Sequence, residues 1–448
     1  MKKYHFFRFM AVFLLLAFFL PGTALALEDP APEATAALVV DATYGEVLYE
    51  MNAHEKRYPA SITKIMTALL TLEAVERGEL ALDDIITAPP GIHNGLSADS
   101  STQNIRNGEQ MTLEDLLYCT LVASANEACN VLAYAVAGDT PAFVEMMNQR
   151  AAELGMTGTH FTNTHGLHDD EHYTTAWDIW LVSNEAMKNE TFREIVATKS
   201  YTVPATNISK ERLFYNTNGL LTALKYSGYL YPPTIGIKTG TTLEAGYCLV
   251  SAAELEGRTL YCVVLGAELV KQPDQSYRRM NFVESTRLLE WGFNHFSYRT
   301  IWESSEPVKE LPVTLSETDH VLVRSEGSIS ALLPNDVDPE DFTRSVTLYS
   351  DSVEAPVTKG QVLGEITLSY DGREYGTLDL VALNDVERSE LMYRIDRAEK
   401  FIAQPWVKFA ALGVLIFILF LIILISALTR KKRRRARAYS GYSGRRRR

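Results

Sequence analysis

The stretch Pro59-Ala-Ser61-Ile-Thr-Lys64-Ile-Met-Thr67 places a serine three residues before a lysine, where a helical pattern begins. Residues three apart on a helix share one face, so Lys64 can reach the Ser61 hydroxyl. A serine hydroxyl is a weak nucleophile and needs a base within hydrogen-bond reach. Lysine is a base only when neutral, so desolvation or a neighbouring cation must lower its pKa, and Lys238 is the candidate neighbour.

Two more short motifs follow in chain order. Ser124-Ala-Asn126 interrupts a helical region over residues 112–136, and a strand is predicted to end at Lys238, the first residue of Lys238-Thr-Gly240. Taken singly, each motif also has a simple structural interpretation. Ser61 and Lys64 are typical of a polar helix start, Ser124-Ala-Asn126 of a turn, and Lys238-Thr-Gly240 of a strand end with a glycine. Their order and combination are the signature of class A β-lactamases and penicillin-binding proteins.

At these residues the chain resembles the D-alanyl-D-alanine carboxypeptidases, the low-molecular-mass penicillin-binding proteins. The resemblance extends over about residues 30 to 390, and these further stretches carry it: Phe161-Thr-Asn-Thr-His-Gly-Leu167 with Thr175, Ala176 and Asp178, and Gly236-Ile-Lys-Thr-Gly-Thr-Thr242 with Ala245-Gly-Tyr247. Thr164 stands where the family usually has proline, which leaves the conformation of that loop open.

The resemblance implies a serine-type peptidase that removes the terminal D-alanine from peptidoglycan stem pentapeptides and binds β-lactam antibiotics covalently. Ser61 would attack the carbonyl between the two D-alanines, Lys64 would take its proton, and Ser124 would relay a proton to the departing amine. By the family's pattern, the backbone N–H groups of Ser61 and Thr241 form the oxyanion hole. We expect no cofactor and no metal.

The same resemblance assigns the substrate-binding residues, which are Asn126, Lys238, Thr239, Gly240 and Thr241. Asn126 would hold substrate amide groups, while Lys238 and Thr239 would bind the terminal carboxylate, for which a cation is the natural complement. Gly240 would let the substrate backbone approach closely as an added strand.

The two ends of the chain predict export and anchoring. Residues 1–26 are typical of a signal peptide with the cleavage site Ala24-Leu-Ala26, an uncleaved anchor being the alternative. Residues 409–429 carry no charge and reach about 31 Å as a helix, enough to span a hydrocarbon core of roughly 30 Å. A buried core helix is the alternative, but the basic tail 430–448 follows at once and is expected in the cytoplasm. We therefore expect a single-pass bacterial membrane protein with its catalytic domain outside.

Charge and cysteine content exclude other classes. With the 11 basic residues of the tail and the 3 of the leader set aside, residues 27–428 carry a net charge of about −27. An acidic exported body argues against a nucleic-acid partner. Cys119, Cys129, Cys248 and Cys262 are too few for a disulfide scaffold; buried thiols are expected, with a Cys248–Cys262 bridge as the alternative.

The pattern between the ends predicts an α+β catalytic domain over residues 27–297, an antiparallel sheet flanked by helices. Its main predicted elements are two hairpins and a closing helix. The first hairpin covers residues 37–40 and 46–49, the second turns at Glu256-Gly257, and the helix runs from Tyr277 to Trp291 and ends at Gly292. A β-rich domain over 298–390 follows, with strands at 313–315, 320–323, 346–349 and 378–381, and residues 391–408 link it to the membrane span.

Several alternatives stay open. His165, His168 and His172 with neighbouring acids have spacings that could bind zinc, although a polar surface loop is the simpler interpretation. A β-lactamase would need a dedicated deacylating glutamate, and no Glu-x-x-Leu-Asn run is present. A penicillin sensor would need a larger cytoplasmic part, and a structural wall-binding protein would not need three intact motifs. A transpeptidase or endopeptidase on the same substrates remains possible, and the third residue of the stem peptide is undetermined.

Overall fold

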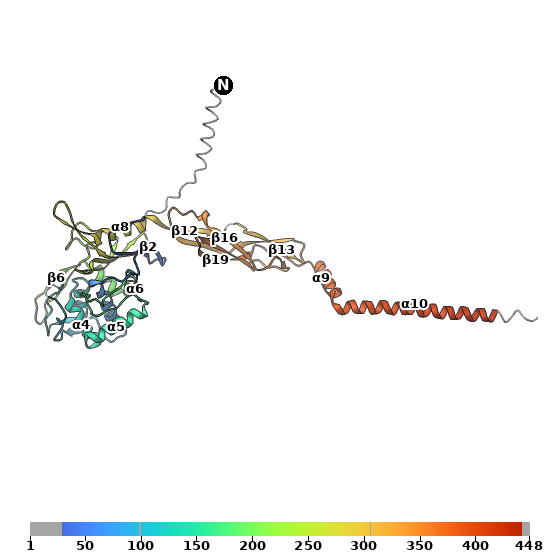
Figure 1. The fold of residues 1–448 in the computed structure, drawn as a ribbon, viewed down its shortest axis with the longest axis horizontal. Coiled ribbons are helices and arrows are strands. Elements are labelled where there is room, and N and C mark those ends of the chain that lie inside the picture. The colour runs from blue at the N-terminus through green and yellow to red at the C-terminus, as the bar shows by residue number, and fades with distance from the viewer. Residues whose placement is uncertain (1–28, 98–99, 305, 441–448) are drawn as a thin grey trace, which may run out of the picture. The chain divides into compact units, whose positions relative to one another are not determined.

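The computed structural model describes residues 29–97, 100–304 and 306–440 (Figure 1), so the predicted signal peptide lies outside the described residues. The chain divides into two compact units. One extends to Tyr298 and includes Leu332–Val337; the other comprises Arg299–Ala331 and the residues from Asp338 on.

The first unit is built on a five-stranded antiparallel sheet in the order β2-β1-β9-β8-β7. Its strands are β1 (Ala36–Asp41), β2 (Glu46–Met51), β7 (Thr234–Thr242), β8 (Gly246–Leu255) and β9 (Arg258–Ala267). The two predicted hairpins are confirmed as β1–β2 and β8–β9. They join through the pairing of β1 with β9, so the beginning of the domain and a segment more than 200 residues later lie side by side.

Helices cover both faces of this sheet. They are η1 (Ala60–Thr63), α2 (Lys64–Glu76), α3 (Leu113–Leu121), α4 (Asn126–Ala137), α5 (Thr140–Glu153), α6 (Ala176–Ala186), α7 (Glu190–Ala197) and α8 (Met280–His295). Alternate residues of β1 separate the two cores, because successive side chains of a strand point to opposite faces. Leu38 packs in the core made with α2 to α7, and Val39 packs in the one made with α8.

Three short two-stranded ribbons complete the unit: β3 (Ile85–Thr87) with β4 (Gln110–Thr112), β5 (Ser200–Val203) with β6 (Arg212–Tyr215), and β10 (Leu269–Lys271) with β11 (Tyr277–Arg279). All four cysteines are buried and free, so the Cys248–Cys262 bridge is not formed.

Two predicted element ends are wrong. β7 does not end at Lys238 but continues through the motif to Thr242. The closing helix begins at Met280, after β11, and passes Gly292 to end at His295. A Cβ at Gly292 would lie 2.9 Å from a Leu260 methyl, so this glycine lets α8 pack closely on the sheet rather than stopping the helix.

The second unit carries a six-stranded sheet in the order β16-β18-β19-β14-β13-β17. The strands are β13 (Lys309–Thr314), β14 (His320–Ser325), β16 (Thr343–Leu348), β17 (Val353–Glu354), β18 (Val362–Tyr370) and β19 (Arg373–Ala382), with η2 (Pro339–Asp341) before β16. A separate ribbon pairs β12 (Phe296–Glu303) with β15 (Ser328–Pro334). The α+β fold followed by an all-β domain is thus confirmed, although β12, β15, β17 and β18 had not been predicted.

Two helices follow the β-rich sheet, α9 (Glu390–Ala403) and α10 (Pro405–Ser440). Within α10, Pro405–Arg433 is long and apolar enough to cross a membrane, and its side chains are exposed in the described chain. This apolar C-terminal helix is consistent with a membrane anchor.

Candidate active site

Ser61 lies in the short 3-10 turn η1, against which two glycines pack. The turn starts at Ala60, whose φ of 47° is rare for a residue with a side chain. A Cβ at Gly240 would lie 2.7 Å from the Pro59 carbonyl oxygen and 3.1 Å from the Ser61 nitrogen. A Cβ at Gly166, whose φ is +88°, would lie 1.8 Å from the Ala60 oxygen. In this structure Gly240 therefore makes room for the nucleophile turn itself, a role different from the predicted approach of the substrate.

Lys64 is the first residue of α2 and is fully buried. Its Nζ lies 2.8 Å from Ser61 Oγ, 2.7 Å from Asn126 Oδ1 and 2.8 Å from the His165 carbonyl oxygen. Burial lowers the Lys64 pKa to about 8, while Cys129 and Glu127 act in the opposite direction. A neutral amine has two N–H donors and one lone pair. The two carbonyl-type acceptors use the donors, which leaves the lone pair for the Ser61 hydroxyl proton.

Ser124 and Lys238 form a second serine–lysine contact. Ser124 lies between α3 and α4 with a φ of 62°, a strained conformation that the surrounding structure must hold. Lys238 reaches it from β7, with Nζ 3.0 Å from Ser124 Oγ and 3.1 Å from the Thr239 carbonyl oxygen. Burial and the nearby Lys64 hold the Lys238 pKa well below its usual value. Desolvation thus acts on both lysines, and the neighbouring-cation effect falls on Lys238 rather than on Lys64.

Both serines, Ser61 and Ser124, line one cavity of about 170 Å³, and the two lysines reach them from behind its wall. Its lining includes Ser61, Ser101, Ser124, Thr217, Tyr226, Thr239, Gly240, Thr241, Arg279, Asn281 and Phe282. Arg279, which comes from the end of β11, belongs to none of the three sequence motifs. Its guanidinium stacks at 4.2 Å on the Tyr226 ring and 5.0 Å from the Tyr247 ring. A fixed guanidinium at the wall of a serine site is a natural partner for a carboxylate.

A family model described as D-alanyl-D-alanine carboxypeptidase matches residues 23–269, more than half of the chain. The chain belongs to the D-alanyl-D-alanine carboxypeptidase family. A second model, described as the C-terminal domain of penicillin-binding protein 5, matches residues 296–388. The two matches correspond to the α+β and the all-β parts of the described fold.

Individual relatives support the same membership. D-alanyl-D-alanine carboxypeptidase DacF of Bacillus subtilis is 29% identical, over 85% of this chain and 91% of its own. DacC of Escherichia coli is 31% identical, over 82% of this chain and 88% of its own. Penicillin-binding protein 5 from Haemophilus influenzae aligns with a TM-score of 0.59 at 28% identity, over 81% of this chain and 100% of that structure.

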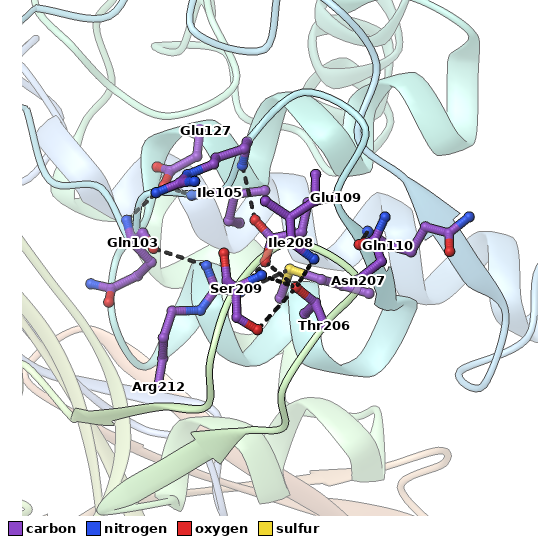
Figure 2. A network of polar contacts seen from close by, with 12 residues as sticks. Gln103, Ile105, Glu109, Gln110, Glu127, Thr206, Asn207, Ile208, Ser209 and Arg212 are labelled. Atoms are coloured by element: carbon purple, nitrogen blue, oxygen red, sulfur yellow. Dashed lines mark hydrogen bonds and ion pairs between the residues drawn. The ribbon is translucent and has the colours of Figure 1, made fainter.

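A buried polar network supports the Ser124-Ala-Asn126 loop of this family member (Figure 2). The Glu127 carboxylate, fully buried, accepts from the backbone N–H groups of Gln103 and Ile105. Arg212 donates to the Gln103 carbonyl oxygen and pairs at 2.7 Å with Glu109, which is also fully buried. The segment so held contains Ser101, whose carbonyl oxygen accepts from the Asn126 N–H. The network therefore fixes one wall of the cavity to the start of α4.

The histidine-rich loop is only in part the predicted polar surface loop. His168, Asp169, Asp170 and Glu171 are exposed, as expected, but His165 and His172 are buried and support the site. Burial lowers the pKa values of these two histidines to about 3 and about 4. His172 Nε2 lies 2.8 Å from Thr63 Oγ1, while the Thr162 N–H donates to its Nδ1. Thr164, the departure from the family pattern, donates its hydroxyl to Asn130. Among the described residues no group of three or more histidine, cysteine or acidic side chains is placed to bind a metal.

Proposed function

We propose that this protein is a serine-type D-alanyl-D-alanine carboxypeptidase that trims peptidoglycan stem peptides through an acyl-enzyme on Ser61. One observation carries the proposal above the others. The buried Lys64 amine lies 2.8 Å from Ser61 Oγ, and both of its N–H groups have other acceptors. This is the arrangement that a lysine needs to act as a general base.

Acylation begins when Ser61 Oγ attacks the carbonyl carbon between the two D-alanines and Lys64 accepts the hydroxyl proton. The tetrahedral intermediate then breaks its C–N bond, and the departing amine takes a proton through Ser124, which lies 3.0 Å from the Lys238 amine. Water attacks the resulting ester and restores Ser61. The backbone N–H groups of Ser61 and Thr241 supply the oxyanion hole, where one donor is worth roughly 2.7–4 kcal/mol.

The substrate binds as an added strand on the free edge of β7. Its terminal carboxylate pairs with Lys238 and Thr239, with Arg279 completing the site from β11. Asn126 holds a substrate amide group through its Nδ2, while its Oδ1 accepts from Lys64. β-Lactams, which carry a strained amide and a carboxylate, would acylate Ser61 in the same position.

Residues 409–429 of α10 would hold the enzyme at a bacterial cell membrane, with the catalytic unit outside and the basic tail in the cytoplasm. The uncharged run followed by eleven basic residues supports this orientation. The substrate, peptidoglycan, lies on the same outer side.

The test is to incubate the full-length protein in detergent with a peptide ending in D-Ala-D-Ala and to assay free D-alanine. Release of D-alanine, with one penicillin adduct per chain by intact mass spectrometry, is the expected result. A stable adduct without D-alanine release would indicate a penicillin sensor, and rapid turnover of penicillin would indicate a β-lactamase.

The second candidate is transfer or endopeptidase cleavage on the same acyl-enzyme. A structure of the Streptomyces K15 DD-transpeptidase is 30% identical over 59% of this chain. Adding a D-amino acid or an amino-group peptide as acceptor distinguishes the two: a carboxypeptidase forms free acid as its main product, and a transpeptidase forms the new amide.

A further inference from the structure

The two acceptors that orient the Lys64 amine come from different parts of the chain. One is Asn126 Oδ1 at the start of α4, and the other is the carbonyl oxygen of His165 in the loop over residues 161–172. A neutral amine has two N–H donors, so its lone pair faces the Ser61 hydroxyl only while both acceptors stay in place. The structure must therefore hold this loop and α4 in a fixed relation.

Thr164 connects the loop to both helices of the serine–lysine site. Its hydroxyl donates to Asn130 Oδ1 at 2.7 Å, and Asn130 lies on α4 one turn after the Lys64 acceptor of that helix. Its carbonyl oxygen accepts from Thr67 Oγ1 at 2.5 Å, and Thr67 lies on α2 three residues after Lys64. The next residue, His165, supplies the second acceptor. One residue thus joins α2, α4 and the loop.

Hydrogen bonds set the position of this loop more than close packing does. Thr164 and Asn130 are buried, and the Asn130 Nδ2 donates to the Ile92 carbonyl oxygen at 2.8 Å, which turns its Oδ1 toward Thr164. The loop also borders a cavity of about 520 Å³, whose lining includes Asn130, Thr164 and His165. Open space beside a loop leaves it room to shift once a hydrogen bond is lost.

We propose that Thr164 is a positioning residue for the general base, and that its hydroxyl bond to Asn130 keeps both acceptors of Lys64 in place. The inference rests on the proposed function, because it takes Lys64 as the base. Among the described residues that line the cavity at Ser61, Thr164 is absent, so it acts through Lys64 and not on the substrate. A proline, the usual residue of the family here, has no hydroxyl group, so the bridge to Asn130 is a feature of this chain.

The experiment measures acylation of the full-length protein in detergent by benzylpenicillin, across pH, by intact mass spectrometry. Thr164→Val keeps the shape of the side chain but removes the hydroxyl, and it should slow acylation at the pH plateau roughly three- to tenfold, as for about one lost hydrogen bond. A misplaced acceptor also disfavours the ammonium form of Lys64, so the acid limb should move to lower pH. Thr164→Ser should restore both the rate and the limb. The variants leave unchanged the ionisable groups that face Lys64, which are Glu127, Cys129, Lys238, His165 and His172.

The matched control is Thr71→Val, the same change at a buried threonine of α2. The Thr71 hydroxyl donates within its own helix, to the Thr67 carbonyl oxygen, so this variant should keep the wild-type rate and acid limb. Asn130→Leu completes a double-mutant cycle. If the two residues act through their shared bond, the double variant should be no slower than Asn130→Leu alone.

Three results would overturn the proposal: a wild-type rate in Thr164→Val, a slower rate with an unmoved acid limb, or additive losses in the cycle. Melting temperatures show whether each variant is folded, and Thr164→Ala replaces the valine variant, with the same expected result, if that one does not fold. A wild type that penicillin does not acylate at all would contradict the proposed function itself, which is a different outcome from a slowed variant.

Discussion

Two serine–lysine contacts have their serines at one small cavity and differ in how the chain makes them. Ser61 and Lys64 are three residues apart and meet across one turn, at 2.8 Å. Ser124 and Lys238 are 114 residues apart and meet at 3.0 Å because β7 runs beside the α3–α4 loop. Each contact includes a residue with a positive φ. In the first it is Ala60, which precedes Ser61, and in the second it is Ser124 itself.

The partners of the two lysines explain why their roles differ. Lys64 has two acceptors besides its serine, so in the neutral state its lone pair faces the nucleophile. Lys238 donates to its serine and to the carbonyl oxygen of its neighbour Thr239, so in the protonated state its third N–H is left for a substrate carboxylate. The first contact is suited to taking a proton, and the second to passing one on and binding an anion.

Removing the nucleophile should give the largest effect. Ser61→Ala should lower kcat for D-alanine release by roughly 10⁴-fold or more, because no acyl-enzyme can form. Intact mass spectrometry after benzylpenicillin treatment should show one adduct in the wild type and none in the variant. Labelling that persists undiminished in Ser61→Ala would remove this serine from its role.

Exchanging each lysine for arginine tests the comparison directly. Lys64→Arg should abolish acylation, since a guanidinium does not act as a base near neutral pH. Lys238→Arg keeps the positive charge and should lose about 10- to 100-fold in kcat/KM, chiefly through KM, as for one weakened charge-assisted hydrogen bond. Equal and total loss in both variants, with both still folded by circular dichroism, would contradict the division of roles.

Gly240→Ala probes the geometry that both contacts share. The new methyl group would lie 2.7 Å from the Pro59 oxygen and 3.1 Å from the Ser61 nitrogen, so the nucleophile turn must shift. A misplacement of about 1 Å costs on the order of 100-fold in rate. We expect slower acylation by penicillin with little change in the melting temperature. The control is Gly257→Ala at the β8–β9 turn, where no atom lies within 4 Å, and it should acylate at the wild-type rate.

The pH dependence should report Lys64. Its neutral form is the base and its pKa is about 8, so acylation should rise with pH and level off above that value. The ionisable groups facing it are Glu127, Cys129, Lys238 and His165. Because the Glu127 carboxylate raises the Lys64 pKa, Glu127→Gln should move the acid limb to lower pH, with no more than a few-fold change in the plateau. A reduced plateau with an unmoved limb would indicate that Glu127 acts only through the network in Figure 2.

The contrast between the two contacts also explains what the sequence could predict. The Ser61–Lys64 contact follows from helix spacing, and the hairpins β1–β2 and β8–β9 follow from local alternation and a glycine turn. The Ser124–Lys238 contact could be found only in the structure, because no local pattern encodes a distance between residues 114 apart. Arg279 and Gly166 were missed for the same reason, since their roles depend on tertiary neighbours. The end of β7 was misplaced because a glycine suggests a turn, whereas Gly240 serves a close contact.

The smallest effect should come from removing the C-terminal helices. Truncation after Ser389 deletes α9 and α10 but keeps the Val357–Val386 bridge and the hydrogen bond from the Ser389 N–H to the Leu315 carbonyl oxygen. Both serine–lysine contacts lie in the first unit, so the truncated protein should bind penicillin and release D-alanine from a small peptide at a near-normal rate. It should no longer need detergent, and it should act less well on intact cell wall, because tethering raises the local concentration of enzyme at the membrane.

The measurement compares the rate of D-alanine release from a soluble peptide with the rate from isolated cell wall, for the truncated and the full-length protein. If the truncated protein lost activity on the small peptide while remaining folded, the anchor region would contribute to catalysis, and neither contact alone would explain the chemistry.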